Sequence, residues 1–79
     1  MSIQTYRVCY YVHNERSRYL DLTVEKYGNI LFRSEAQDRA KALLKQLKAY
    51  YIRHLHKRYY TIQTMVVDND SREVFDRYE

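Results

Sequence analysis

One long stretch of the chain repeats apolar residues at the spacing of a helix, from Ser34 to about Lys57. Ser34, followed three residues later by Gln37, has the form of a capping box, so we expect the helix to begin at Ser34. No Gly or Pro interrupts the stretch. The apolar residues recur at steps of three or four, which places them on one stripe of the helix: Ala36, Ala40, Leu43, Leu44, Leu47, Tyr51 and Leu55.

The rest of the chain alternates apolar and polar residues at the spacing of β-strands. The alternation predicts strands over residues 3–13, 19–26, 30–33 and 59–67. Residues 73–78 are either a fifth strand at the edge of the sheet or a frayed tail. The order of these elements predicts an α+β fold in two layers. We expect an antiparallel sheet of four to five strands with one long helix packed on one face, in the order β-β-β-α-β-β.

Gly28, the only glycine, is followed by Asn29, and this pair favours a hairpin turn. A three-residue loop over 27–29 keeps the apolar residues of both flanking strands on one face, whereas a two-residue loop does not. The sequence therefore predicts a hairpin between the second and third strands. In the first strand, Tyr6, Val8, Tyr10 and Val12 are expected to face the helix.

The length of 79 residues predicts a single α+β domain over residues 1–79. A chain of this size buries only about 60% of its unfolded surface, so a homodimer would help to enlarge its core. One cysteine allows no disulfide within the chain. The sequence has neither the apolar stretch of a signal peptide nor a run long enough to cross a membrane, so we expect a cytoplasmic protein with no membrane partner.

The residue types that carry catalysis and metal binding are few and badly spaced. Cys9 and His13 lie about 13 Å apart on one strand, too far for a nucleophile pair. His54 and His56 point about 200° apart around a helix, so they cannot hold one ion together. A single glycine cannot form a phosphate-cradling loop. We therefore expect no enzyme activity, no cofactor and no metal.

Ten tyrosines are the strongest anomaly of composition. Many of them are expected to fill core edges with the ring while the hydroxyl stays in water. Exposed tyrosine is also typical of protein interfaces. Strand alternation places four of them on the exposed sheet face, and these are the candidate protein-binding residues: Tyr11, Tyr19, Tyr27 and Tyr59.

The formal net charge is +4, and the basic residues concentrate on the predicted helix. Seven of them could neutralise phosphates, and they are the candidate nucleic-acid-binding residues of an alternative function: Arg39, Lys41, Lys45, Lys48, Arg53, Lys57 and Arg58. The acidic residues of the C-terminal segment oppose this field. No RNP, KH or helix-turn-helix signature is present in the sequence.

We favour a small, non-enzymatic protein-binding module, with nucleic-acid binding as the alternative. Small proteins of phages and other mobile elements often have this profile, among them inhibitors of host defence such as anti-CRISPR proteins. The likeness is one of profile, and no sequence motif carries it. An inhibitor of a host protein or nucleoprotein complex is therefore the specific expectation. The positive net charge excludes an acidic mimic of DNA.

Overall fold

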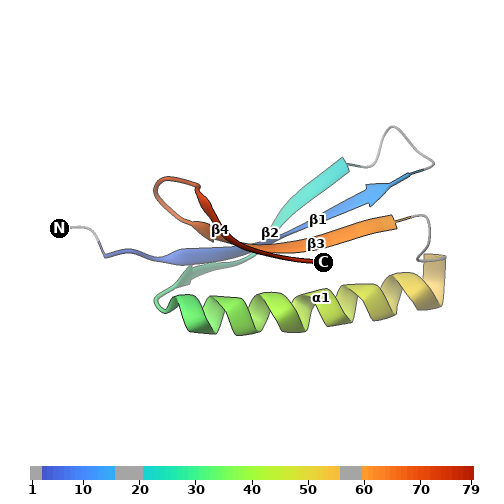
Figure 1. Ribbon diagram of the computed structural model, residues 1–79, viewed down its shortest axis with the longest axis horizontal. Coiled ribbons are helices and arrows are strands. Elements are labelled where there is room, and N and C mark those ends of the chain that lie inside the picture. Colours follow the sequence, from blue (N-terminus) through green and yellow to red (C-terminus); the bar gives the residue numbers. More distant parts are fainter. Residues whose placement is uncertain (1–2, 16–20, 56–59) are drawn as a thin grey trace.

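The computed structural model describes residues 3–15, 21–55 and 60–79, which form four strands and one helix (Figure 1). The elements are β1 (Tyr6–Asn14), β2 (Asp21–Ile30), α1 (Arg33–Leu55), β3 (Tyr60–Asp68) and β4 (Val74–Tyr78). All neighbouring strands are antiparallel, in the order β2-β1-β3-β4. The helix runs along one face of the sheet and contacts mainly β3 and β1. The predicted α+β architecture is confirmed, with four strands.

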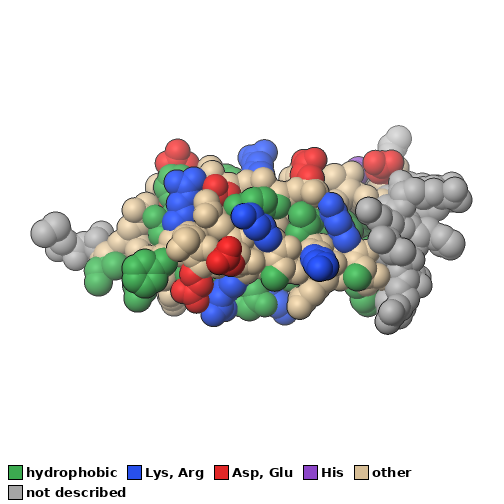
Figure 2. Space-filling view, turned by 60° about the horizontal axis from the view of Figure 1, so that its bottom comes forward, with side chains coloured by type: hydrophobic (Ala, Val, Ile, Leu, Met, Phe, Trp, Pro, Cys, Tyr) green, Lys and Arg blue, Asp and Glu red, His purple; other side chains and the backbone are tan. Residues whose placement is uncertain are grey.

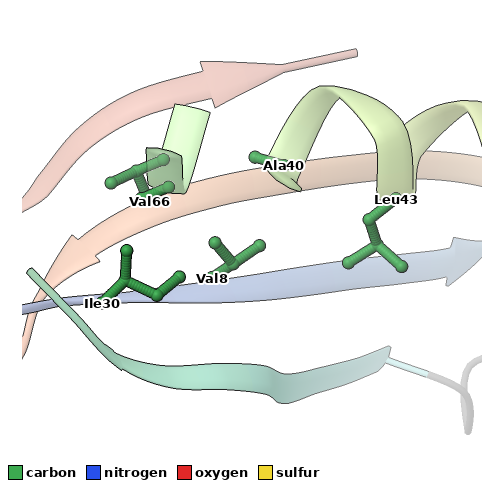
Figure 3. Close-up of a cluster of buried hydrophobic side chains, with 6 residues drawn as sticks. Val8, Ile30, Ala40, Leu43 and Val66 are labelled. Carbon is green, nitrogen blue, oxygen red and sulfur yellow. The ribbon is translucent and has the colours of Figure 1, made fainter. Parts of the chain in front are cut away.

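The core lies between α1 and the two central strands. Figure 3 shows Val8 on β1, Val66 on β3 and Ile30 at the end of β2 gathered near Ala40 and Leu43 of the helix. The even-numbered residues of β1 face the helix as predicted. The predicted helix stripe is confirmed for the residues that the structure buries most, which are Ala36, Ala40, Leu43 and Leu44. The helix comes close to the sheet because two of these four side chains are alanine.

The helix begins one residue before the predicted N-cap. The amide of Ala36 donates to the carbonyl of Phe32 over 3.1 Å, so Phe32 holds the N-cap position. The predicted N-cap at Ser34 is therefore wrong. Gln37 directs its side-chain amide to the carboxylate of Asp76 on β4, at 3.1 Å. Contact between the first helical turn and β4 thus replaces the expected local capping box. The predicted helix end at Lys57 lies outside the described residues.

β2 continues without a break through the segment where the sequence pattern predicts a hairpin. The predicted loop over 27–29 and the separate strand over 30–33 are both wrong. Gly28 and Asn29 form a bulge instead, because these two residues lie opposite the single β1 residue Arg7. Asn29 takes the left-handed backbone conformation, with a φ of 56°, which asparagine adopts more readily than most residues.

Both edge strands of the sheet contain bulges. Lys26 is a second extra residue in β2, since its neighbours Glu25 and Tyr27 pair with adjacent residues of β1. Phe75 is the extra residue in β4. Bulges interrupt the row of backbone donors and acceptors that an edge strand presents to another strand. Both edges are therefore poorly suited to extension of the sheet by a further chain.

Candidate interaction surfaces

Tyr11 is the one predicted binding tyrosine that the structure places on the sheet face away from the helix. It alternates with Tyr10, which packs against the core, and it is half-buried. Its ring stacks on that of His13, with ring centroids 6.3 Å apart. Cross-strand pairing places Tyr11 between Thr23 of β2 and Gln63 of β3, near the middle of this face.

Tyr27 does not lie on the exposed face, so its predicted exposure there is wrong. Its ring packs against the hydrophobic core, and the guanidinium of Arg39 lies over it at 5.1 Å from the centroid. The physical reason is the bulge at Lys26, which shifts the alternation of β2 by one residue and turns Tyr27 toward the helix. Tyr19 and Tyr59 lie outside the described residues.

Several other tyrosines seal the edges of the layer between helix and sheet. Tyr6, Tyr10 and Tyr78 pack against the buried core. Near the far end of α1, the rings of Tyr51 and Tyr60 lie 4.8 Å apart. Burial, reinforced by neighbouring tyrosines, raises the pKa of the Tyr51 hydroxyl. Much of the tyrosine excess therefore serves packing.

The predicted basic residues that the structure describes are spread around α1. Arg39 lies over the ring of Tyr27 at one flank of the helix, and Lys41 lies over the ring of Tyr78 at the other. Lys41 and Lys45 are exposed and Lys48 is half-buried. Arg39 forms an ion pair with Glu35 at 3.1 Å. Figure 2 shows blue and red side chains mixed over this surface. Arg53 lies in the last turns of α1, whereas Lys57 and Arg58 lie outside the described residues. The described part of the helix therefore offers a discontinuous basic surface.

Three large apolar side chains are exposed at one end of the molecule, and we call this set the apolar end: Ile3, Leu31 and Phe32. They are 75%, 56% and 66% exposed. Leu31 and Phe32 link β2 to α1, and Ile3 precedes β1 at the same end of the sheet. Figure 2 shows hydrophobic side chains grouped there, at the left of the described part. At about 200 Å² for each large side chain, the patch exposes roughly 400 Å².

Hydrogen bonds fix the backbone that carries Ile3. The amide of Asn69 donates to the carbonyl of Thr5 at 3.1 Å, and its side-chain amide donates to the Thr5 hydroxyl at 2.7 Å. Gln4 donates to Asp68 at 3.2 Å. These bonds hold the N-terminal segment against the β3–β4 turn. Ile3 is therefore presented from an anchored segment.

The link that carries Leu31 and Phe32 is anchored by Arg33. Its guanidinium donates to both carboxylate oxygens of Asp76, at 3.0 and 3.1 Å, and to the carbonyl of Phe75 at 3.3 Å. The hydrogen bond from Arg33, with help from Gln37, holds the pKa of Asp76 below its ordinary value. The positive charge of Arg33, beside the apolar end, is thus compensated by the carboxylate of Asp76 in the same chain.

The described residues offer little for catalysis. Among them, no three His, Cys, Asp or Glu side chains are grouped so that they could hold a metal ion. Burial raises the pKa of the Cys9 thiol, although Arg7 opposes this effect. A raised pKa lowers the fraction of reactive thiolate at neutral pH. The absence of enzyme activity stays a prediction.

Comparison with known proteins gives no relative from which a function could be transferred. No protein-family model, no curated protein and no solved structure matches the chain. In the described part, α1 lacks the combination of length and apolar character that a membrane-crossing helix needs. A cytoplasmic location stays a prediction.

The sequence reasoning missed the apolar end. The alternating pattern assigned Ile30, Leu31 and Phe32 to a strand in which Phe32 would face the helix. In the structure only Ile30 is buried. The sequence did contain a signal for this exposed patch, which was the run of three consecutive apolar residues directly before the helix. A short link at the edge of the sheet cannot bury all three of their side chains.

Proposed function

We propose that the protein is a protein-binding module that contacts its partner through the apolar end. The observation that carries this proposal is the exposure of Ile3, Leu31 and Phe32 on anchored backbone. Patches of about 300–600 Å² are often the functional surface of a small protein. An anchored backbone loses little conformational freedom on binding, which favours affinity.

The partner surface that fits best is an uncharged apolar groove on another protein. Arg33 is paired with Asp76, and Arg7 donates to Asn69 at 2.7 Å and to Glu25 at 3.3 Å. With these charges compensated, the apolar end has little electrostatic attraction for phosphate groups or anionic lipid. Two copies joined only through this patch would bury about 800 Å² in total, which is below the size of a stable interface.

The test is binding of a purified partner by the full chain and by the double variant Leu31→Ser with Phe32→Ser. The partner is first captured from a nuclease-treated lysate, identified and purified. The variant should bind at least about tenfold more weakly, as expected when interface anchors are lost. Lys45→Ser is the matched control, because it changes an exposed side chain on the outer side of α1 and should keep wild-type affinity.

Two results would overturn this proposal. The first is unchanged affinity of the Leu31→Ser, Phe32→Ser variant for the purified partner. The second is binding of the wild-type chain to anionic lipid vesicles with a loss in the same variant, which would assign the apolar end to a membrane. The narrower expectation of an inhibitor carried by a phage or mobile element stays a prediction, as does nucleic-acid binding by the basic helix face.

A further inference from the structure

The sheet face opposite α1 supports an inference that is independent of the apolar end. β1 and β3 form the centre of this face, and β2 and β4 form its two margins. Among the described elements, the only helix packs on the other face (Figure 1). We propose that this face binds the same face of a second copy of the chain, in a two-fold symmetric dimer.

Two rows of cross-strand neighbours run over this face from one margin to the other. The first row consists of Glu25, Cys9, Met65 and Arg77, in the order β2, β1, β3, β4. The second row consists of Thr23, Tyr11, Gln63 and Glu79, and Gln63 donates a hydrogen bond to Glu79. Directly paired residues of antiparallel strands point to the same side of a sheet. The charged side chains in these rows are therefore at the margins.

One symmetry operation places each row opposite the same row of a second copy, so that complementary side chains face each other. A two-fold axis parallel to the strands, between β1 and β3, lays β2 of one copy over β4 of the other. Arg77 then faces Glu25 of the second copy, and this pair occurs twice. Cys9 faces Met65 at the centre. In the second row, the hydroxyl of Thr23 faces the carboxylate of Glu79.

The marginal charges are available for these contacts. Arg77 is exposed, and the side chain of Glu25 is 49% exposed. Glu25 already accepts a hydrogen bond from Arg7 at 3.3 Å, but a carboxylate has acceptor sites for a second guanidinium. Charge pairs at the margin of an interface contribute mainly to the choice and orientation of the partner.

Size and edge geometry also favour a face-to-face dimer. Strands of nine, ten, nine and five residues, at about 3.3 Å per residue and about 4.8 Å apart, give roughly 500 Å² per copy and about 1,000 Å² in total. This area is near the lower limit for a specific interface, so the dimer should be weak and concentration-dependent. The bulged edges of β2 and β4 disfavour the alternative of edge-to-edge pairing.

The small core gives a physical reason for such a dimer. In the described part of the chain, Val8, Val66 and Thr64 are the largest side chains with no exposed surface, whereas the larger Ile30 and Leu43 of the core stay slightly exposed. Packing a second sheet about 10 Å away would bury the exposed parts of Tyr11 and Met65 in a second apolar layer. Because the axis is parallel to the strands, both apolar ends would lie at the same end of the dimer.

The test is the molar mass in solution by sedimentation equilibrium over a wide concentration range. The wild-type chain should approach twice its mass of 9.8 kDa as concentration rises. Glu25→Arg and Arg77→Glu should each remain monomeric, because each places like charges opposite each other. An equimolar mixture of the two variants should dimerise again, because both facing pairs then join an arginine to a glutamate.

The matched control is a mixture of Glu35→Arg and Lys45→Glu, which makes the same changes in net charge on the outer side of α1. Each of these variants alone should dimerise as the wild type does. A wild-type chain that stays monomeric up to its solubility limit would overturn the dimer. So would a dimer that survives both single charge reversals, or one that the Leu31→Ser, Phe32→Ser variant dissociates. Circular dichroism verifies that each variant is folded.

Discussion

The hydroxyl of Thr64 donates a hydrogen bond of 2.8 Å to the main-chain carbonyl of Ala40, and both residues are fully buried. This bond ties β3 directly to the backbone of α1. It is possible because alanine at position 40 lets the helix backbone approach the sheet. Helix and sheet are thus joined by a polar contact inside an otherwise apolar core.

Thr64→Val should lower the free energy of unfolding by about 1 kcal/mol. Valine keeps the shape of threonine but cannot donate the hydrogen bond to Ala40. Urea unfolding monitored by circular dichroism measures the change. Gln46→Ala is the control, since Gln46 is exposed on α1 and its replacement should change stability by less than about 0.5 kcal/mol. Equal stability of Thr64→Val and wild type would show that the hydrogen bond contributes nothing.

Substitutions of the two bulge residues of β2, Gly28 and Asn29, should affect stability differently. Gly28→Ala should be neutral or stabilising by up to about 1 kcal/mol, because its φ is not positive and an added Cβ meets only the flexible end of Glu25, at 2.9 Å. Asn29→Val should destabilise by about 1–2 kcal/mol, because Asn29 has a left-handed backbone. Thermal unfolding of the two variants tests this contrast, and a reversed order would refute the observed register.

Two carboxylates should make the protein sensitive to acid. Hydrogen bonds from the backbone and hydroxyl of Ser71 lower the pKa of Asp68, and Arg33 lowers that of Asp76. A folded-state pKa below the unfolded value gives stability that is present above the unfolded pKa, about 3.9. That stability is lost as pH falls through the folded-state pKa, because the unfolded chain binds protons first.

Replacement of one carboxylate should reduce this pH dependence. Asp76→Asn should lower stability at neutral pH and flatten its decline between about pH 5 and pH 2. Asp70→Asn is the control at an exposed position. Urea midpoints at a series of pH values provide the measurement. A decline as steep in Asp76→Asn as in wild type would contradict the assigned role of the Arg33–Asp76 pair.

Cys9 should react slowly with a thiol reagent at neutral pH. Its burial raises the thiol pKa, and reaction requires the thiolate. The rate should rise strongly when the chain is unfolded in urea, which gives an internal control. A rate in the folded protein equal to that in urea would show that the thiol is neither protected nor held protonated.

The two layers of this fold could be predicted from the sequence, because the spacing of apolar residues reflects which side of each helix or strand is buried. The helix stripe and the even-numbered residues of β1 were identified, since most residues that face away from water are apolar and recur at the period of the helix or strand. Alternation also placed Tyr11 on the face away from the helix. These features follow from the local spacing of residue types.

The bulges and the helix start could not be predicted because they depend on tertiary contacts. The pairing of β2 with β1 decides that Lys26 is an extra residue, and this reverses the predicted orientation of Tyr27. Contact of Arg33 and Gln37 with Asp76 sets the first helical turn. Phe32 is exposed because β2 ends at Ile30 and the helix begins at Arg33, which leaves Phe32 in the link between them. The candidate binding surface therefore moved from the tyrosines to the link between strand and helix.

The most direct test of the protein-binding function is the salt dependence of affinity for the purified partner. Binding through the apolar end should change little with salt, and the Leu31→Ser, Phe32→Ser variant should bind more weakly at every salt concentration. Nucleic acid, titrated in parallel, would instead give a log–log slope of about −2 to −3 if Lys41, Lys45 and Lys48 bind its phosphates. A slope of that size, with wild-type affinity in the serine variant, would contradict the proposed function.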